Sequence, residues 1–143
     1  TDVSDVVVLK NPFEDQLYRN NPTMIFCGDE PEILENEWMH KHAQYLRSKI
    51  LDYSIYEEKF KNETLLNCGI IGGNFSIIYP FIDELWSLHR QYNRDNDTPY
   101  TGDMGAFNFL ARTRYQAKLI HGSPINTKFK SYTANKICWF KHK

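Results

Sequence analysis

Two carboxylates near the start of the chain are the residues whose type and spacing most readily suggest chemistry. Asp2 and Asp5 are three positions apart, and the apolar, β-branched run Val6–Leu9 follows them. Carboxylate oxygens are the ligands that hard divalent cations prefer in proteins. A short buried strand over Val6–Leu9 would hold both carboxylates at the mouth of a cleft. The same spacing is also typical of helix caps and turns, so a metal site and a structural role are both open on spacing alone.

Polar residues that interrupt or follow other apolar runs are the next candidates. Asn67 and Gly69 lie within the run Leu65–Gly73. A glycine inside a strand often permits the close approach of a ligand or another backbone, and a buried Asn side chain needs a hydrogen-bond partner. Asn67 therefore either faces a ligand or satisfies a neighbouring backbone group. Asp103 opens a predicted helix, where the helix dipole favours a carboxylate, and this is a sufficient structural reason for its presence.

Two histidines follow the last two apolar runs of the chain. His121 and His142 each lie just past a predicted strand, and ligands of open α/β sheets bind beyond strand ends. His121 is more readily explained as a packing residue. His40 and His42 are two positions apart in one predicted helix, so they point to different sides and do not suit joint metal binding. We interpret both as surface or packing histidines.

An alternation of strands and helices must position these residues. A turn is predicted over Gly28–Pro31, between the second strand and the first long helix. The predicted strands are Val6–Leu9, Thr23–Cys27, Leu65–Gly73, Ala117–Ile120 and Ile137–Phe140, and the predicted helices cover 31–51, part of 52–62, 75–92 and 103–115. This order predicts an α/β fold in which helices flank a mixed sheet.

Composition excludes several classes of protein. The formal net charge of −1 indicates neither a nucleic-acid partner nor a general membrane surface. No transmembrane segment and no signal peptide are predicted. The three cysteines are far apart, odd in number and in apolar surroundings. We expect free, buried thiols in a reducing compartment and therefore a cytoplasmic protein.

Four stretches, taken together and in order, resemble the catalytic half of a nucleotide-sugar glycosyltransferase of the GT-A type. They are Asp2–Asp5, Asn67–Gly73, Gly102–Asn108 and Trp139–Lys143. The resemblance covers nearly the whole chain and is greatest to a group of bacterial enzymes of poorly defined substrate. It implies a single α/β domain over 1–143. Because the nucleotide-recognising strands of such enzymes precede the acidic motif, it also implies the C-terminal part of a longer glycosyltransferase.

The resemblance implies a metal site at the acidic motif. Asp2, Asp5 and His142 would hold Mn²⁺ or Mg²⁺ against the diphosphate of the sugar donor, with His121 as the second choice for the histidine. The metal would neutralise the charge that develops on the leaving diphosphate. The Asp-x-x-Asp spacing departs from the Asp-x-Asp that is common in the family.

The resemblance also implies contacts to the sugars and the phosphates. Asn67 and Gly69 would lie along the donor sugar, Asp103 would contact the donor or acceptor sugar, and Lys141 and Lys143 would face the phosphates. An inverting enzyme needs a carboxylate base on the acceptor hydroxyl, and Asp103 is the candidate. In a retaining enzyme Asp103 would orient sugar hydroxyls instead. The expected partners are a nucleoside-diphosphate sugar and a saccharide or glycoconjugate acceptor.

Two other functions are compatible with the sequence. One is a non-catalytic carbohydrate-binding or interaction module with a glycosyltransferase-like fold, because the nine tyrosines offer aromatic faces that could stack on sugars. The other is a metal-dependent phosphoester hydrolase, although such sites usually need more ligands than this chain offers at recognisable spacing.

Overall fold

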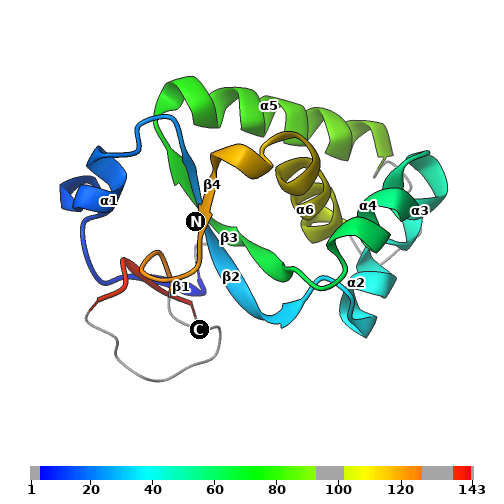
Figure 1. Cartoon of the computed structure of the whole chain (residues 1–143), viewed down its shortest axis with the longest axis horizontal. Coiled ribbons are helices and arrows are strands. Elements are labelled where there is room, and N and C mark those ends of the chain that lie inside the picture. Colours follow the sequence, from blue (N-terminus) through cyan, green and yellow to red (C-terminus); the bar gives the residue numbers. More distant parts are fainter. Residues whose placement is uncertain (1–3, 93–101, 127–136, 143) are drawn as a thin grey trace.

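A mixed three-stranded sheet lies at the centre of the computed structural model, which describes residues 4–92, 102–126 and 137–142. The sheet has the order β3-β2-β4. Strand β2 (Ile25–Ile33) runs antiparallel to β3 (Thr64–Gly73) and parallel to β4 (Leu119–His121). Figure 1 shows these strands with helices around them. The predicted α/β class, with helices flanking a mixed sheet, is confirmed.

The turn predicted over Gly28–Pro31 is wrong, because β2 continues through these residues to Ile33. The long partner β3 supplies pairing along this stretch, with Gly28 opposite Asn67. The register shifts between Asp29 and Ile33, and Pro31 falls in this interval. A strand tolerates a proline at a bulge or irregularity, so β2 continues through these turn-forming residues.

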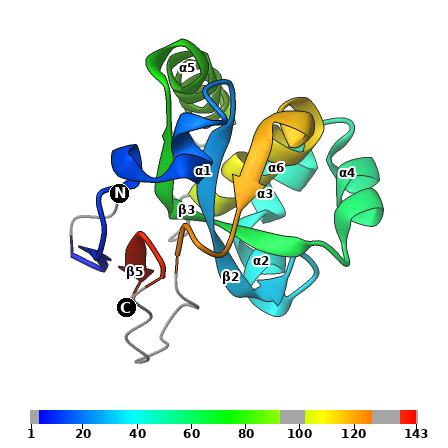
Figure 2. The same cartoon turned by 60° about the vertical axis from the view of Figure 1, so that its left-hand side comes forward.

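The single helix predicted over 31–51 is also wrong. Two short helices, α2 (Glu37–His42) and α3 (Gln44–Lys49), replace it. The side chain of Asn36 accepts a hydrogen bond from the Met39 amide and caps α2 at its first turn, so the helix begins six residues later than predicted. A third helix, α4 (Tyr53–Phe60), follows. These three helices gather at the right-hand end of the molecule in Figure 1, the end that is turned to the back in Figure 2.

The two long helices lie where they were predicted. They are α5 (Phe75–Tyr92), which contains Pro80 without being broken by it, and α6 (Asp103–Arg114). Both pack on one face of the sheet, where Ile25 and Cys27 of β2 contact Phe81 of α5 and Phe107 of α6 within one buried cluster. The alternate residue Phe26 belongs to a different cluster on the opposite face. This alternation is the expected consequence of the period of two in a strand.

A buried asparagine joins α6 to β3. The side chain of Asn108 is fully buried. Its Oδ1 accepts a hydrogen bond from the Leu66 amide at 2.9 Å, and its Nδ2 donates to the carbonyl oxygens of Leu66 and Met104 at 3.0 Å each. The amide and carbonyl of Leu66 therefore point to the edge of β3 away from β2.

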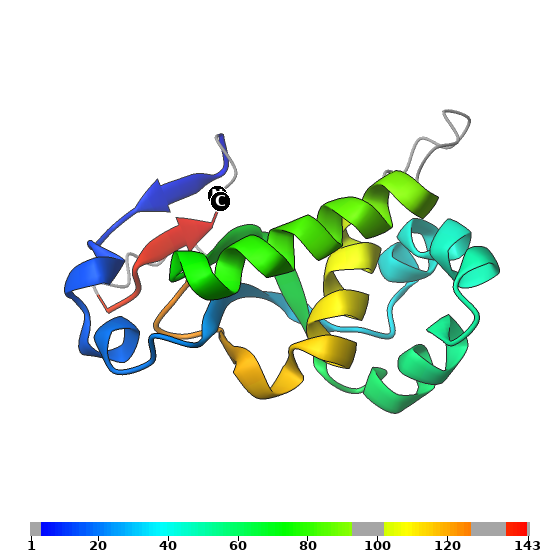
Figure 3. The same cartoon turned by 90° about the horizontal axis from the view of Figure 1, so that it is seen from above.

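A second, two-stranded element lies at the other end of the molecule. Strands β1 (Val6–Val8) and β5 (Phe140–His142) pair antiparallel and lie side by side in Figure 3. We call this element the β1–β5 ribbon. The predicted first strand exists, but its predicted burial is wrong: Val8 is 63% exposed, because the strand joins the ribbon rather than the central sheet. The last strand begins at Phe140, later than predicted.

Two short helical turns, η1 (Pro12–Glu14) and α1 (Gln16–Arg19), connect β1 to the body, and a third, η2 (Gln116–Lys118), leads into β4. The ribbon is attached to α1 by Trp139, whose Nε1 donates to Asp15 Oδ2 at 2.9 Å. Among the described helices, none combines the length and apolar character that crossing a bilayer requires. The three cysteines are free, as predicted: two are buried and Cys68 is half-buried.

Candidate functional site

A cavity of about 580 Å³ lies between the β1–β5 ribbon, the β2–β3 pair and helices α2 and α6. We call it the acidic cavity. Its lining residues are Asp5, Glu30, Pro31, Glu32, Asn36, Trp38, His42, Leu65, Asn67, Cys68, Gly69, Asp103, Met104 and His142. Its volume is in the range of ordinary small-molecule sites.

Residues predicted from separate parts of the sequence meet in this cavity. Asp5 precedes β1, Asn67 and Gly69 lie on β3, Asp103 begins α6, and His142 ends β5. The pairing of β1 with β5, with Val6 opposite His142, brings the first and last of them to the same place.

The remaining predicted site residues lie elsewhere or outside the described residues. Asp2 and Lys143 belong to the latter group. Lys141 is half-buried and is not among the residues that line the acidic cavity. Neighbouring side chains on a strand point to opposite faces, so Lys141 and His142 diverge. His121 Nδ1 lies 2.7 Å from Asp29 Oδ1, and His121 does not line the cavity.

Asn67 is at the centre of the polar part of the wall. Its side chain is buried, and its Oδ1 accepts a hydrogen bond from the Gly69 amide at 2.8 Å. This bond directs Nδ2 toward Glu30 Oε1 and toward His142 Nδ1, the latter at 2.9 Å. Since an amide nitrogen only donates, Nδ1 of His142 accepts this hydrogen bond, as in the tautomer whose N–H is at Nε2.

Glu30 is a cavity residue that the sequence prediction missed. It was assigned to a turn, whereas it lies on β2 and accepts a hydrogen bond from Asn67. No spacing motif marks it. The one available signal was the buried polar Asn67, which required a partner somewhere in the fold.

An aromatic pair on α2 forms another part of the wall. Trp38 is 46% exposed, and its ring stacks on His42 with a centroid distance of 3.6 Å and an interplanar angle of 23°. Burial lowers the pKa of His42, and the nearby negative charge of Asp103 partly opposes this shift. His42 was predicted to be a surface or packing histidine. The spacing of four between a Trp and a His was a signal that the two rings would meet on a helix.

Asp103 has the predicted place in the first turn of α6. The preceding Gly102 caps the helix with φ of 66°, a conformation that favours glycine. The Asp103 carboxylate accepts a hydrogen bond from the Met104 amide at 2.8 Å. Asp103 is exposed and lines the cavity, so the structural role does not remove its carboxylate from the site.

The charged side chains in the wall of the acidic cavity are acidic. Asp5, Glu30, Glu32 and Asp103 bring four carboxylates to the cavity, and its described lining residues include no Lys or Arg. Such a wall offers many hydrogen-bond acceptors, and it repels anions unless a cation is present.

The fit of a metal ion can be judged from the donor types. Asp5 and His142 offer the oxygen and nitrogen ligands of a hard divalent cation. Within residues 4–92, 102–126 and 137–142, no group of three or more His, Cys, Asp or Glu side chains could hold a metal ion. A metal at this motif would therefore also need Asp2. Coordination by His142 Nε2 would move the ring proton to Nδ1, which requires the Asn67 amide to turn.

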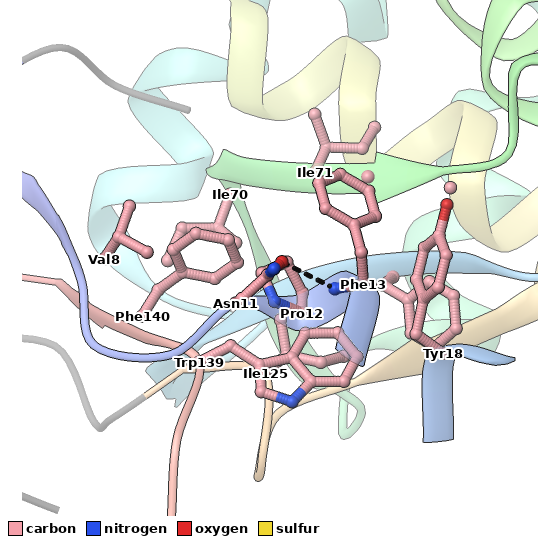
Figure 4. A pocket seen from close by; sticks show the side chains of 13 residues that line it. Val8, Asn11, Pro12, Phe13, Tyr18, Ile70, Ile71, Ile125, Trp139 and Phe140 are labelled. Carbon is pink, nitrogen blue, oxygen red and sulfur yellow. Dashed lines mark hydrogen bonds between the residues drawn. The ribbon is translucent and has the colours of Figure 1, made fainter. Parts of the chain in front are cut away.

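A second cavity, of about 480 Å³, lies beside the ribbon (Figure 4). Aromatic and aliphatic side chains dominate its wall, among them Phe13, Tyr18, Ile70, Trp139 and Phe140. Its described lining residues include no charged side chain. Its polar side chains are those of Asn11 and Tyr18, and the Tyr18 hydroxyl donates to Asn74 Oδ1 at 2.8 Å, so we do not assign chemistry to it.

Comparisons of this chain with protein-family models, with curated proteins and with solved structures return no match. A functional assignment therefore depends on the acidic cavity.

Proposed function

We propose that this chain carries the catalytic site of a metal-dependent glycosyltransferase of the GT-A type. The enzyme moves a sugar from a nucleoside-diphosphate donor to a saccharide or glycoconjugate acceptor. One observation carries this proposal: Asp5, Asn67, Gly69, Asp103 and His142, which come from four distant stretches, line one cavity. The mixed sheet with helices packed on it is compatible with the later half of that fold.

In this proposal Asp2, Asp5 and His142 would hold Mn²⁺ or Mg²⁺, and the cation would supply positive charge to balance that of the leaving diphosphate. The carboxylate wall explains why a cation is required, because the diphosphate would otherwise be repelled. With its amide turned so that Oδ1 accepts a hydrogen bond from Nδ1–H, Asn67 would orient the metal-bound His142 ring. Gly69, with no side chain, leaves room for the donor sugar against β3.

Asp103 is the proposed contact to the reacting sugars. Its exposed carboxylate could accept the proton of an acceptor hydroxyl in an inverting reaction. In a retaining reaction the same carboxylate would accept hydrogen bonds from sugar hydroxyls. The stereochemistry of a product formed with a fluorinated or natural donor would distinguish the two roles.

Calorimetric titration with Mn²⁺, with and without UDP or GDP, tests the proposal. We expect nucleotide binding that depends on Mn²⁺, is lost in Asp5→Asn and is weakened in His142→Ala. Asp83→Asn is the matched control, because Asp83 is an exposed carboxylate of α5 outside the cavity. Nucleotide binding that is equally strong in Asp5→Asn, or that does not depend on Mn²⁺, would refute the proposal.

A carbohydrate-binding module without turnover is the second candidate. The observation that favours it is the exposed Trp38 in a cavity whose described residues do not complete a metal site. Binding of free sugars without metal, together with no binding of nucleotide in its presence, would favour this function over the first.

A further inference from the structure

Trp38 is the one Trp, Tyr or Phe side chain in the described wall of the acidic cavity. Trp38 is 46% exposed although it lines the cavity. Among the other apolar lining residues, Leu65 and Met104 are buried, and the exposed Pro31 has no aromatic ring. An exposed indole at a cavity wall offers a flat apolar area that a ligand can cover.

The indole is held in a defined orientation before any ligand arrives. His42, one helical turn along α2, stacks on one face of the Trp38 ring at 3.6 Å. A restrained side chain loses less conformational entropy on binding than a free one, so the stack favours binding to the opposite face. The helix itself is anchored by the buried Met39 and by the Asn36 cap.

The charge around Trp38 determines which class of ligand fits the cavity. The wall supplies carboxylate acceptors from Asp5, Glu30, Glu32 and Asp103. A nucleobase with its phosphates would bring further negative charge to a wall that already has an excess of it. A neutral saccharide brings an apolar C–H face for the indole and hydroxyl donors for the carboxylates.

We infer that Trp38, supported by His42, is a saccharide-binding platform at the α2 side of the acidic cavity and binds the acceptor sugar. The sugar stacks its C–H face on the free face of the indole and donates hydroxyl hydrogen bonds to nearby carboxylates, among them Asp103. Only the assignment of the bound sugar as the acceptor rests on the proposed function, because the binding of a neutral saccharide does not require a nucleotide or a metal.

The indole N–H signals in ¹⁵N-labelled protein test the platform directly. The chain has three tryptophans, so the signals of Trp38, Trp86 and Trp139 can be assigned by substitution. Methyl β-glucoside, methyl β-galactoside, methyl α-mannoside and methyl β-N-acetylglucosaminide are added separately at millimolar concentration, without metal. We expect at least one of them to shift the Trp38 signal in a saturable manner. Trp139 is buried and should not respond.

Trp86 provides the matched control. It is 59% exposed on α5 and also stacks on a histidine, His89, but it does not line the cavity. Trp38→Ala should weaken glycoside binding about tenfold, Trp38→Phe should retain part of it, and Trp86→Ala should leave it unchanged. Circular dichroism of each variant confirms that it is folded. No shift at Trp38 with any glycoside, or equal shifts at Trp38 and Trp86, would overturn the inference.

A second readout uses a thiol in the same wall. Cys68 lines the cavity and is half-buried. A glycoside bound on Trp38 should slow the reaction of Cys68 with a thiol reagent, and this protection should be absent in Trp38→Ala. Equal reaction rates with and without a glycoside that shifts Trp38 would place that glycoside outside the cavity and overturn the inference.

Different outcomes would refute the glycosyltransferase proposal and the Trp38 platform. Saturable glycoside binding at Trp38 without Mn²⁺-dependent nucleotide binding would retain the platform and remove the glycosyltransferase. Nucleotide binding that Asp5→Asn abolishes, with no response of Trp38 to any glycoside, would retain the glycosyltransferase and remove the platform.

Discussion

Replacing the buried Asn108 should cost more stability than any exposed substitution. Asn108→Leu keeps the number of side-chain heavy atoms and leaves no cavity, but its methyl groups are larger than the amide, so crowding at this buried site adds to the loss of the polar contacts. The amide and carbonyl of Leu66, and the carbonyl of Met104, then lose their hydrogen bonds to this side chain. Leu66 is fully buried, so water cannot easily replace the lost partner.

The magnitude follows from the two buried backbone groups of Leu66. Each buried group left without a partner costs about 1–3 kcal/mol, and we expect a total loss near 3 kcal/mol. This is a large part of the free energy of unfolding of about 5–15 kcal/mol that is usual for a domain. With a urea slope of about 2 kcal/mol per molar, the midpoint falls by about 1.5 M.

Urea unfolding followed by circular dichroism measures this loss. Asn62→Leu is the control, because Asn62 is exposed in a turn, and its midpoint should stay within about 0.3 M of the wild type. A loss below about 1 kcal/mol in Asn108→Leu would refute the reasoning. It would mean that the free edge of β3 reaches water or another partner near Leu66.

Three further predictions concern local contacts. The hydrogen bond from Trp139, followed by that from a backbone amide, lowers the pKa of Asp15 from 3.8, so Asp15 stabilises the fold above that pH and loses this effect as the pH falls through its folded pKa. Asp15→Asn should therefore destabilise by about 1 kcal/mol at pH 7 and progressively less in acid, as measured by urea unfolding. Gly122→Ala should cost about 2 kcal/mol, because φ is 77° and the new Cβ would lie 2.5 Å from a carboxylate oxygen, whereas Gly72→Ala meets no atom within 4 Å and should cost less than 1 kcal/mol. In the folded protein a thiol reagent should modify Cys68 first, and the two buried cysteines only after unfolding.

Periodicity predicted the long elements of this fold well. Strand β3 and helices α5 and α6 each have enough residues for their apolar pattern to outweigh single exceptions, including Pro80 in α5. The errors fall where local chemistry and tertiary pairing disagree. Gly28–Pro31 has the composition of a turn, yet the partner strand keeps it extended. Such pairing is a long-range interaction that a local pattern does not contain.

The residues of the acidic cavity divide in the same way into those that could be predicted from the sequence and those that could not. Asn67 could be selected from sequence because a polar residue in an apolar run is locally anomalous. Its partner Glu30 could not, because an acidic residue in a polar stretch is ordinary until the fold brings it to Asn67. Trp38 was missed for a related reason: a tryptophan in a predicted helix is ordinary until the fold leaves it exposed at a cavity.

The β1–β5 ribbon has a consequence for the order in which the protein folds. Its pairing of Val6 with His142 joins residues from opposite ends of the described chain, so this contact closes the longest loop among the described strand pairs. Loop-closure entropy disfavours such a contact until the intervening chain is compact. Helix α6 can dock on β2 and β3 beforehand. The acidic cavity, which needs Asp5 and His142, would then be completed last and opened first. Amide hydrogen exchange in the ribbon should be faster than in β2 and β3, and a ligand held between the ribbon and the helices would slow it.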